Sequence, residues 1–144
     1  MNHSKKKISR KAKIIILSAL ALFAIALAFG VNYLITYVNY ERDTAAIQIQ
    51  NVDLTTIGDG EFFGEVDVGF IRASVRVVIE NHVITELELL EHYNDRGAAA
   101  NLLPDRILEA QRIDVDAVSG ATQSSKVIQE AVFRALTGES TIGR

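Results

Sequence analysis

Four hydroxyl side chains and a glycine lie within residues 119–125, near the C-terminal end of the chain. They are Ser119, Gly120, Thr122, Ser124 and Ser125. The backbone N–H groups at the start of a helix point outward, and the positive end of the helix dipole lies there. Hydroxyls combined with such N–H groups can bind a phosphate. Phosphate binding is therefore our first hypothesis for this segment.

A helix is expected directly after these hydroxyls, because apolar residues recur there with a period near 3.6. Its apolar face comprises Val127, Ile128, Ala131, Val132, Ala135 and Leu136. Ser and Thr before an apolar run are also typical of an ordinary helix N-cap, and Gly138 suits the C-terminal end. The pattern alone leaves both interpretations open.

An uncharged, mostly apolar segment, residues 14–38, predicts one transmembrane helix. At about 1.5 Å per residue it would extend about 37 Å, enough to cross a bilayer with some tilt. Tyr33, Tyr37 and Tyr40 cluster at one end, where aromatic side chains prefer the membrane interface. A cleaved signal peptide is the alternative, since residues 26–28 (Ala-Leu-Ala) resemble a cleavage site. The apolar run is longer than the core of such a peptide, so we expect a retained anchor.

The formal net charge of −3 hides a strong asymmetry. Residues 1–13 carry six basic and no acidic side chains, whereas the remainder carries nine basic and eighteen acidic ones. Lys and Arg mark cytoplasmic flanks, so we expect a cytoplasmic tail over residues 1–13 and an outer domain beyond a single-pass plasma-membrane helix. An acidic outer part argues against nucleic-acid binding. The chain has no cysteine, which excludes disulfides and a lipoprotein anchor.

Residues 39–56 are polar and mixed, and we expect a stalk there. Strands are predicted over residues 62–70, 71–79 and 83–90, from alternating apolar residues and turn signals. In the middle strand one face should hold Ile71, Ala73, Val75, Val77 and Ile79. In the returning strand Val83, Thr85, Leu87 and Leu89 should share a face.

Helices are predicted over residues 98–111 and 123–137. Pro104 suits the first turn of a helix or a break between two short ones. The expected fold class is α+β: a small antiparallel sheet with helices packed on one face, preceded by one N-terminal transmembrane helix. The globular domain should span residues 57–138, followed by a short tail over residues 139–144.

Residues 57–138 resemble the FMN-binding domain family, as found in the C subunit of sodium-translocating NADH:quinone oxidoreductase and the G subunit of ferredoxin:NAD oxidoreductase. Four stretches carry the resemblance, in the family's order. They are residues 59–64 running to Gly69 and Phe70, the hairpin of residues 75–83, residues 90–95 (Leu-Glu-His-Tyr-Asn-Asp), and residues 116–125 (Asp-Ala-Val-Ser-Gly-Ala-Thr-Gln-Ser-Ser).

The resemblance implies that FMN is the cofactor and that Thr122 carries it through a phosphoester bond. It further implies that a dedicated flavin transferase makes this bond, taking FMN from FAD. Thr122 has no histidine nearby in sequence, which also favours an external enzyme. The neighbouring motif residues are expected to contribute to the site: Asp116, Ser119, Gly120, Ala121, Ser124 and Ser125. For Asp116 a turn-forming role, and for Ser124 and Ser125 a role in the first helical turn, are the alternatives.

The resemblance places Gly64, Gly69 and Phe70 in a possible flavin pocket, although Phe70 also suits plain core. His92 is a candidate flavin contact as well, because histidine can exchange protons near pH 7. We expect no metal site, since Glu91, His92 and Asp95 lack a partner cluster. His3 and His82 are expected to be inert, and Glu86 and Glu88 to lie on a solvated sheet face.

We therefore expect a membrane-anchored extracytoplasmic flavoprotein that acts as an electron-transfer carrier. It would pass electrons between a membrane donor and an extracytoplasmic acceptor, and membrane lipid would surround its anchor. We expect an electron carrier or an oxidoreductase subunit more than a stand-alone enzyme. A non-covalent FMN-binding sensor and a structural subunit of an envelope redox complex are the alternatives.

Overall fold

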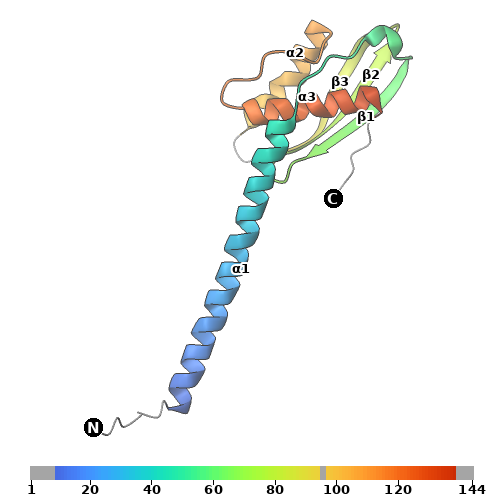
Figure 1. The fold of residues 1–144 in the computed structure, drawn as a ribbon. Coiled ribbons are helices and arrows are strands. Elements are labelled where there is room, and N and C mark those ends of the chain that lie inside the picture. The colour runs from blue at the N-terminus through green and yellow to red at the C-terminus, as the bar shows by residue number, and fades with distance from the viewer. Residues whose placement is uncertain (1–8, 95–96, 139–144) are drawn as a thin grey trace. The chain divides into compact units, whose positions relative to one another are not determined.

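The computed structural model describes residues 9–94 and 97–138 (Figure 1). The chain divides into two compact units, Met1–Thr36 and Tyr37–Arg144. The expectations for His3, for Asp95, for the tail at 139–144 and for most of the basic tail lie outside the described residues.

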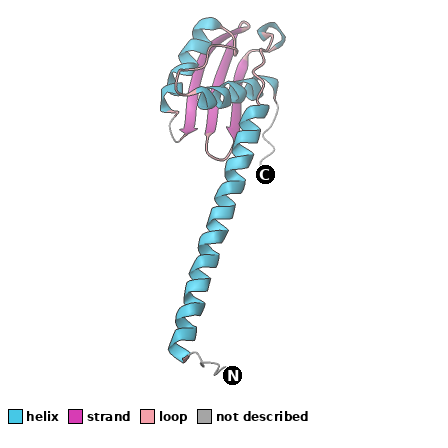
Figure 2. Cartoon of the chain, turned by 60° about the vertical axis from the view of Figure 1, so that its left-hand side comes forward, coloured by secondary structure: helices cyan, strands magenta, loops and turns pink. Residues whose placement is uncertain are grey.

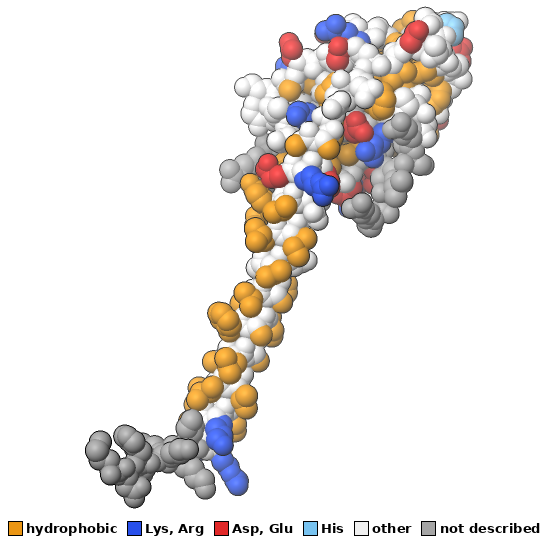
Figure 3. Space-filling view, in the orientation of Figure 1, with side chains coloured by type: hydrophobic (Ala, Val, Ile, Leu, Met, Phe, Trp, Pro, Cys, Tyr) orange, Lys and Arg blue, Asp and Glu red, His pale blue; other side chains and the backbone are white. Residues whose placement is uncertain are grey.

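The first long element, α1 (Arg10–Ala46), is a continuous α-helix. It is the one described helix long and apolar enough to cross a membrane, and none of its apolar window is buried inside the protein. Figure 3 shows hydrophobic side chains along this helix. A core helix of a soluble protein would bury such a surface, whereas a helix in lipid leaves it exposed. The predicted N-terminal apolar helix is therefore present.

Residues 37–56, which include the expected stalk, contribute to packing in the second unit. Thr44 is fully buried, and its hydroxyl donates to the carbonyl oxygen of Tyr40 at 2.6 Å. Ile47, Ile49 and Val52 are partly buried against the hydrophobic core. A short 3-10 helix, η1 (Leu54–Thr56), then leads into the sheet.

Three antiparallel strands form one sheet in the order β1-β2-β3: β1 (Gly60–Asp67), β2 (Arg72–Glu80) and β3 (Val83–Tyr93). Helices lie on one face of this sheet (Figure 2). The expected α+β class is therefore confirmed. The alternation predicted for the middle strand is also confirmed, because Ala73, Val75, Val77 and Ile79 are all fully buried.

The face predicted for β3 is only half right, because two bulges interrupt its alternation. Val78 pairs with Glu86 and Ile79 with Ile84, so Thr85 is an extra residue. Val83 and Thr85 are consequently exposed, while Ile84 is buried.

The second bulge of β3 leaves Leu90 as an extra residue between Leu89 and Glu91. Beyond it, His92 pairs with Ala73, which is fully buried. Directly paired residues point to the same side of a sheet. The side chain of His92 is therefore directed toward the face that the helices cover.

Three helical elements follow the sheet: η2 (Ala98–Leu102), α2 (Leu103–Ala110) and α3 (Thr122–Thr137). Pro104 lies in the first turn of α2, where its missing N–H costs nothing. The apolar face predicted for the last helix is entirely buried.

Gly64 allows α3 to lie directly on β1. A Cβ atom at Gly64 would lie 2.0 Å from the carbonyl oxygen of Ala131 and 2.7 Å from the nitrogen of Ala135. Both contacts are with the backbone of α3, at a distance that excludes any side chain. The role of Gly64 in this structure is therefore close packing of helix on strand.

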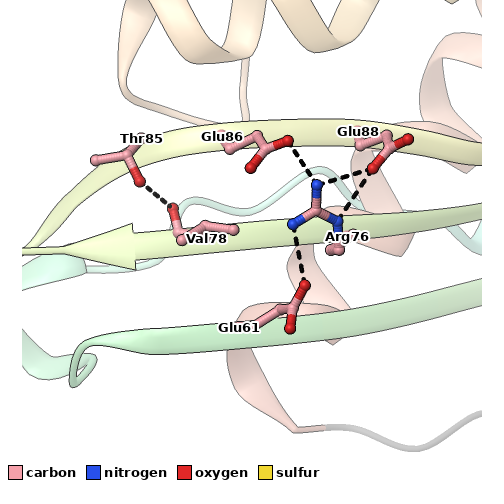
Figure 4. A network of polar contacts seen from close by, with 6 residues as sticks. All are labelled: Glu61, Arg76, Val78, Thr85, Glu86 and Glu88. Atoms are coloured by element: carbon pink, nitrogen blue, oxygen red, sulfur yellow. Dashed lines mark hydrogen bonds and ion pairs between the residues drawn. The ribbon is translucent and has the colours of Figure 1, made fainter.

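The opposite face of the sheet is open and carries a cluster around Arg76 (Figure 4). The Arg76 guanidinium donates to Glu61 on β1 and to Glu86 and Glu88 on β3. These bonds raise the pKa of Arg76, with the Glu88 bond contributing most. Glu86 and Glu88 are exposed, as predicted, and the shared arginine offsets their mutual repulsion.

Candidate functional site

A tight turn precedes α3 and contains the residues in which we predicted phosphate chemistry. The Ala121 N–H donates to the Val118 carbonyl oxygen at 2.9 Å. Gly120 has a φ of 77°, the left-handed conformation that the third position of a type II turn requires. A Cβ atom at Gly120 would meet nothing within 4 Å. Glycine is thus needed for the backbone conformation and not for space.

The helix α3 begins at Thr122 without a side-chain cap. Its N-cap residue is Ala121, which makes no side-chain hydrogen bond to the helix. Alanine at this position costs about 0.5–2 kcal/mol relative to Ser, Thr, Asn or Asp. The ordinary N-cap interpretation of the hydroxyls is therefore wrong here, and the first N–H groups are left for an external acceptor.

The hydroxyl residues divide into an exposed and a buried pair. Ser119 and Thr122 are exposed, so an enzyme and a bulky nucleotide can reach the Thr122 hydroxyl. Ser124 and Ser125 are buried. The Ser125 hydroxyl oxygen accepts a hydrogen bond from the Val118 N–H at 3.0 Å, which ties the turn to the helix. Ser125 therefore has a structural role in this part of the chain.

The loop that carries Asp116 is held by residues that the sequence analysis missed. The Gln129 amide donates to the carbonyl oxygens of Ile113 and Val115, both at 2.8 Å. Gln129 is 2% exposed, and the signal that could have revealed it is a polar residue on the apolar face of α3. Asn51, from far earlier in the chain, accepts from the N–H groups of Ile113 and Asp114.

Asp116 itself is exposed. Its backbone carbonyl oxygen accepts a hydrogen bond from Arg106 at 3.3 Å. This contact attaches the backbone of the loop to α2, while the residue stays exposed.

A second set of residues lies at and after the end of β3, and one of them, Gly97, contacts the start of α3. A Cβ atom at Gly97 would lie 1.8 Å from the Ser124 hydroxyl oxygen, so Gly97 packs directly on Ser124. His92 Nδ1 lies 2.6 Å from the Asn101 side-chain oxygen in η2, the element that Gly97 precedes. The sequence indicates His92 as a candidate, whereas no sequence signal marks Gly97 or Asn101.

Gly69 and Phe70 lie in the β1–β2 turn. The Val68 N–H donates to the Ile71 carbonyl oxygen, and Gly69 has a φ of 88°, which explains the glycine. The ring of Phe70 packs edge-to-face on Tyr40, with ring centroids 5.5 Å apart. Phe70 therefore helps to attach the end of α1 to the sheet.

Within residues 9–94 and 97–138, no group of three or more His, Asp or Glu side chains could hold a metal ion. His82 lies in the β2–β3 turn, and its Nδ1 lies 3.0 Å from the Ile57 carbonyl oxygen. This contact gives His82 a structural role at the other end of the sheet from His92.

These observations fit a phosphate-bearing cofactor. An exposed threonine hydroxyl lies beside free helix N–H groups. Two buried side-chain polar atoms of the described residues, Ser124 Oγ on the same helix and His92 Nε2 on β3, have no partner. The fold is thus a small α+β domain, and its turn and helix start offer groups that could hold a phosphate-bearing cofactor.

Comparison with known families identifies the cofactor. Residues 69–137 match the family model of the FMN-binding domain. This part of the chain is therefore similar to an FMN-binding domain, which indicates FMN as the cofactor. The match extends from the β1–β2 turn to the end of α3 and includes residues 116–125 and His92. No curated protein matches the chain.

Proposed function

We propose that this chain is a membrane-anchored extracytoplasmic electron carrier whose FMN is joined to Thr122 through a phosphoester bond. The observation that carries the proposal is the position of Thr122: exposed, first in α3, and behind an N-cap that supplies no side-chain hydrogen bond. The family resemblance of residues 116–125 gives this threonine the role of acceptor.

The attachment balances as a phosphoryl transfer without any redox change. The Thr122 hydroxyl oxygen forms a bond to the FMN phosphorus of FAD, and the phosphoanhydride bond to the AMP half breaks. AMP leaves, and the Thr122 proton passes to a base. We assign that base to the external transferase.

The residues around Thr122 then hold the diester. Its one remaining negative charge is favoured by the positive end of the α3 dipole and by the uncapped N–H groups of the first turn. Gly120 shapes the turn, and Ser125 fixes it through Val118. When bound, FMN supplies the redox chemistry, while the protein positions it and tunes its electronics.

Transferase dependence tests the attachment route. Chain expressed without a flavin transferase should show no flavin fluorescence on a denaturing gel, and chain expressed with one should be labelled. Full labelling without the transferase would show self-attachment and contradict the external base. Visible flavin absorbance that disappears on denaturation would instead identify a non-covalent FMN-binding domain.

The membrane part of the proposal rests on the exposed apolar surface of α1 and on the six basic residues that precede residue 14. The N-terminus lies in the cytoplasm and the FMN domain outside, where a covalent bond prevents loss of the cofactor. Its electrons come from a membrane donor and pass to an extracytoplasmic acceptor.

Protease added to intact cells or spheroplasts should digest the FMN domain, and the chain should sediment with membranes. A domain protected until the membrane is broken would contradict the orientation. Release of the whole chain into the medium without detergent would contradict the anchor.

A further inference from the structure

Two buried side-chain polar atoms in the described part of the chain lack any hydrogen-bond partner: His92 Nε2 and Ser124 Oγ. They come from different elements, β3 and α3, yet both border η2. His92 contacts Asn101 within η2, and Ser124 lies against Gly97, which directly precedes it. Native proteins rarely leave buried polar atoms unpaired, so two beside one short element need an explanation.

Ser124 differs from three other hydroxyl residues in helices of the second unit. Thr44 and Thr137 each donate to the carbonyl oxygen four residues earlier in their helix. The neighbouring Ser125 accepts from Val118. Ser124 is only 1% exposed and makes no such bond. Its hydroxyl therefore lacks a hydrogen-bond partner in the FMN-free chain.

The contact of His92 with Asn101 determines which kind of partner Nε2 needs. The Asn101 side-chain oxygen can only accept, and at 2.6 Å its contact with Nδ1 is much shorter than the 3.4 Å approach of the Asn94 amide nitrogen to the same atom, so these contacts favour the tautomer in which Nδ1 carries the proton. In the neutral ring Nε2 is then an acceptor and needs a donor. A phosphodiester has only acceptors and cannot satisfy it. The isoalloxazine ring has an N–H between two carbonyl oxygens, which offers both a donor and acceptors.

We infer that His92 Nε2 and the Ser124 hydroxyl bind the polar edge of the FMN ring, with Asn101 positioning His92. This inference rests on the proposed attachment of FMN at the neighbouring Thr122. His92 accepts the ring N–H, and Ser124 donates to a ring carbonyl oxygen. Both atoms are buried in the FMN-free chain, so the ring must displace protein neighbours to reach them. Because a bond donated to the carbonyl draws electron density from the ring, it favours the reduced form.

Ser124→Ala and Ser125→Ala form a matched pair of neighbouring buried serines. Without FMN, Ser124→Ala should leave the melting temperature unchanged or raise it, because it removes an unpaired hydroxyl from a helix. With FMN it should reduce the rise in melting temperature that loading produces. Ser125→Ala should lower the melting temperature in both forms, because it breaks the bond to Val118. If Ser124→Ala lowers the melting temperature equally with and without FMN, as the loss of a bond to an internal water would, the inference is overturned.

His92→Leu tests the second atom, with His82→Asn as the control at the other end of the sheet. His92 accepts from the ring N–H and so pushes electron density into the ring, which disfavours the reduced form. We therefore expect His92→Leu to leave loading unaffected and to strengthen the relative binding of the reduced form about tenfold, which raises the potential by about 30 mV for a two-electron couple. The control should keep the wild-type potential. An unchanged potential in His92→Leu, as contact with the phosphate alone would give, overturns the inference.

Failure of the proposed covalent attachment at Thr122 can be distinguished from failure of this inference. If the wild-type chain holds no covalent FMN, attachment at Thr122 is wrong. The potential of His92→Leu and the melting temperatures of Ser124→Ala, both measured with added FMN, still decide the roles of the two residues.

Discussion

Thr122→Ala should carry no covalent FMN, because the substitution removes the only oxygen through which we propose that the phosphate is joined. The effect should be complete and not graded, since alanine offers no atom for a phosphoester. Thr122 is exposed, so the fold should survive, and the free energy of unfolding should change by no more than about 0.5 kcal/mol. Flavin fluorescence on a denaturing gel, after co-expression with a flavin transferase, measures the result.

Two further variants make this experiment specific. Thr122→Ser keeps a hydroxyl on the same first turn of α3 and should retain partial labelling. Ser119→Ala removes the other exposed hydroxyl of the turn and should leave the linkage in place. Covalent fluorescence retained by Thr122→Ala, or lost only in Ser119→Ala, would show that the acceptor is a different residue.

Gly64→Ala should destabilise the domain by about 1–3 kcal/mol, the range typical of overpacked cores. The added methyl carbon would lie 2.0 Å from the Ala131 carbonyl oxygen. A side chain could rotate away from such a contact, but a helix backbone cannot. Therefore α3 must move away from β1, and the start of α3, which carries Thr122, would shift with it. Urea unfolding of the FMN-free chain measures the loss.

Gly58→Ala is the matched control for this substitution. A Cβ atom at Gly58 would meet nothing within 4 Å, so its effect should stay within about 0.5 kcal/mol. Labelling by the transferase should fall in Gly64→Ala and be normal in Gly58→Ala. Equal unfolding midpoints for the two variants would refute the close packing of α3 on β1.

Local patterns of the sequence predicted much of this fold. The alternation of β2 and the apolar face of α3 each follow from a period that one element imposes on its own residues. The face of β3 could not be predicted in the same way, because bulges at Thr85 and Leu90 shift its alternation twice. A bulge depends on pairing with β2, and nothing in the sequence of β3 alone specifies it.

The candidate site was predictable to a similar degree. The motif of residues 116–125 indicated Thr122, but it could not separate Ser125, which bonds Val118, from Ser124, whose hydroxyl is unpaired. Nor could it show that His92, thirty residues before Thr122, is directed to the covered face of the sheet. These distinctions depend on contacts between residues that are distant in sequence.

The central claim is the covalent attachment of FMN to Thr122, and the most direct test is mass measurement on the protein from its native membrane. The account predicts an intact mass equal to the chain plus one FMN less one water, with the added mass on the peptide that contains Thr122. The same material should absorb visible light at the flavin bands. A mass equal to that of the amino acids alone, in colourless protein, would contradict it.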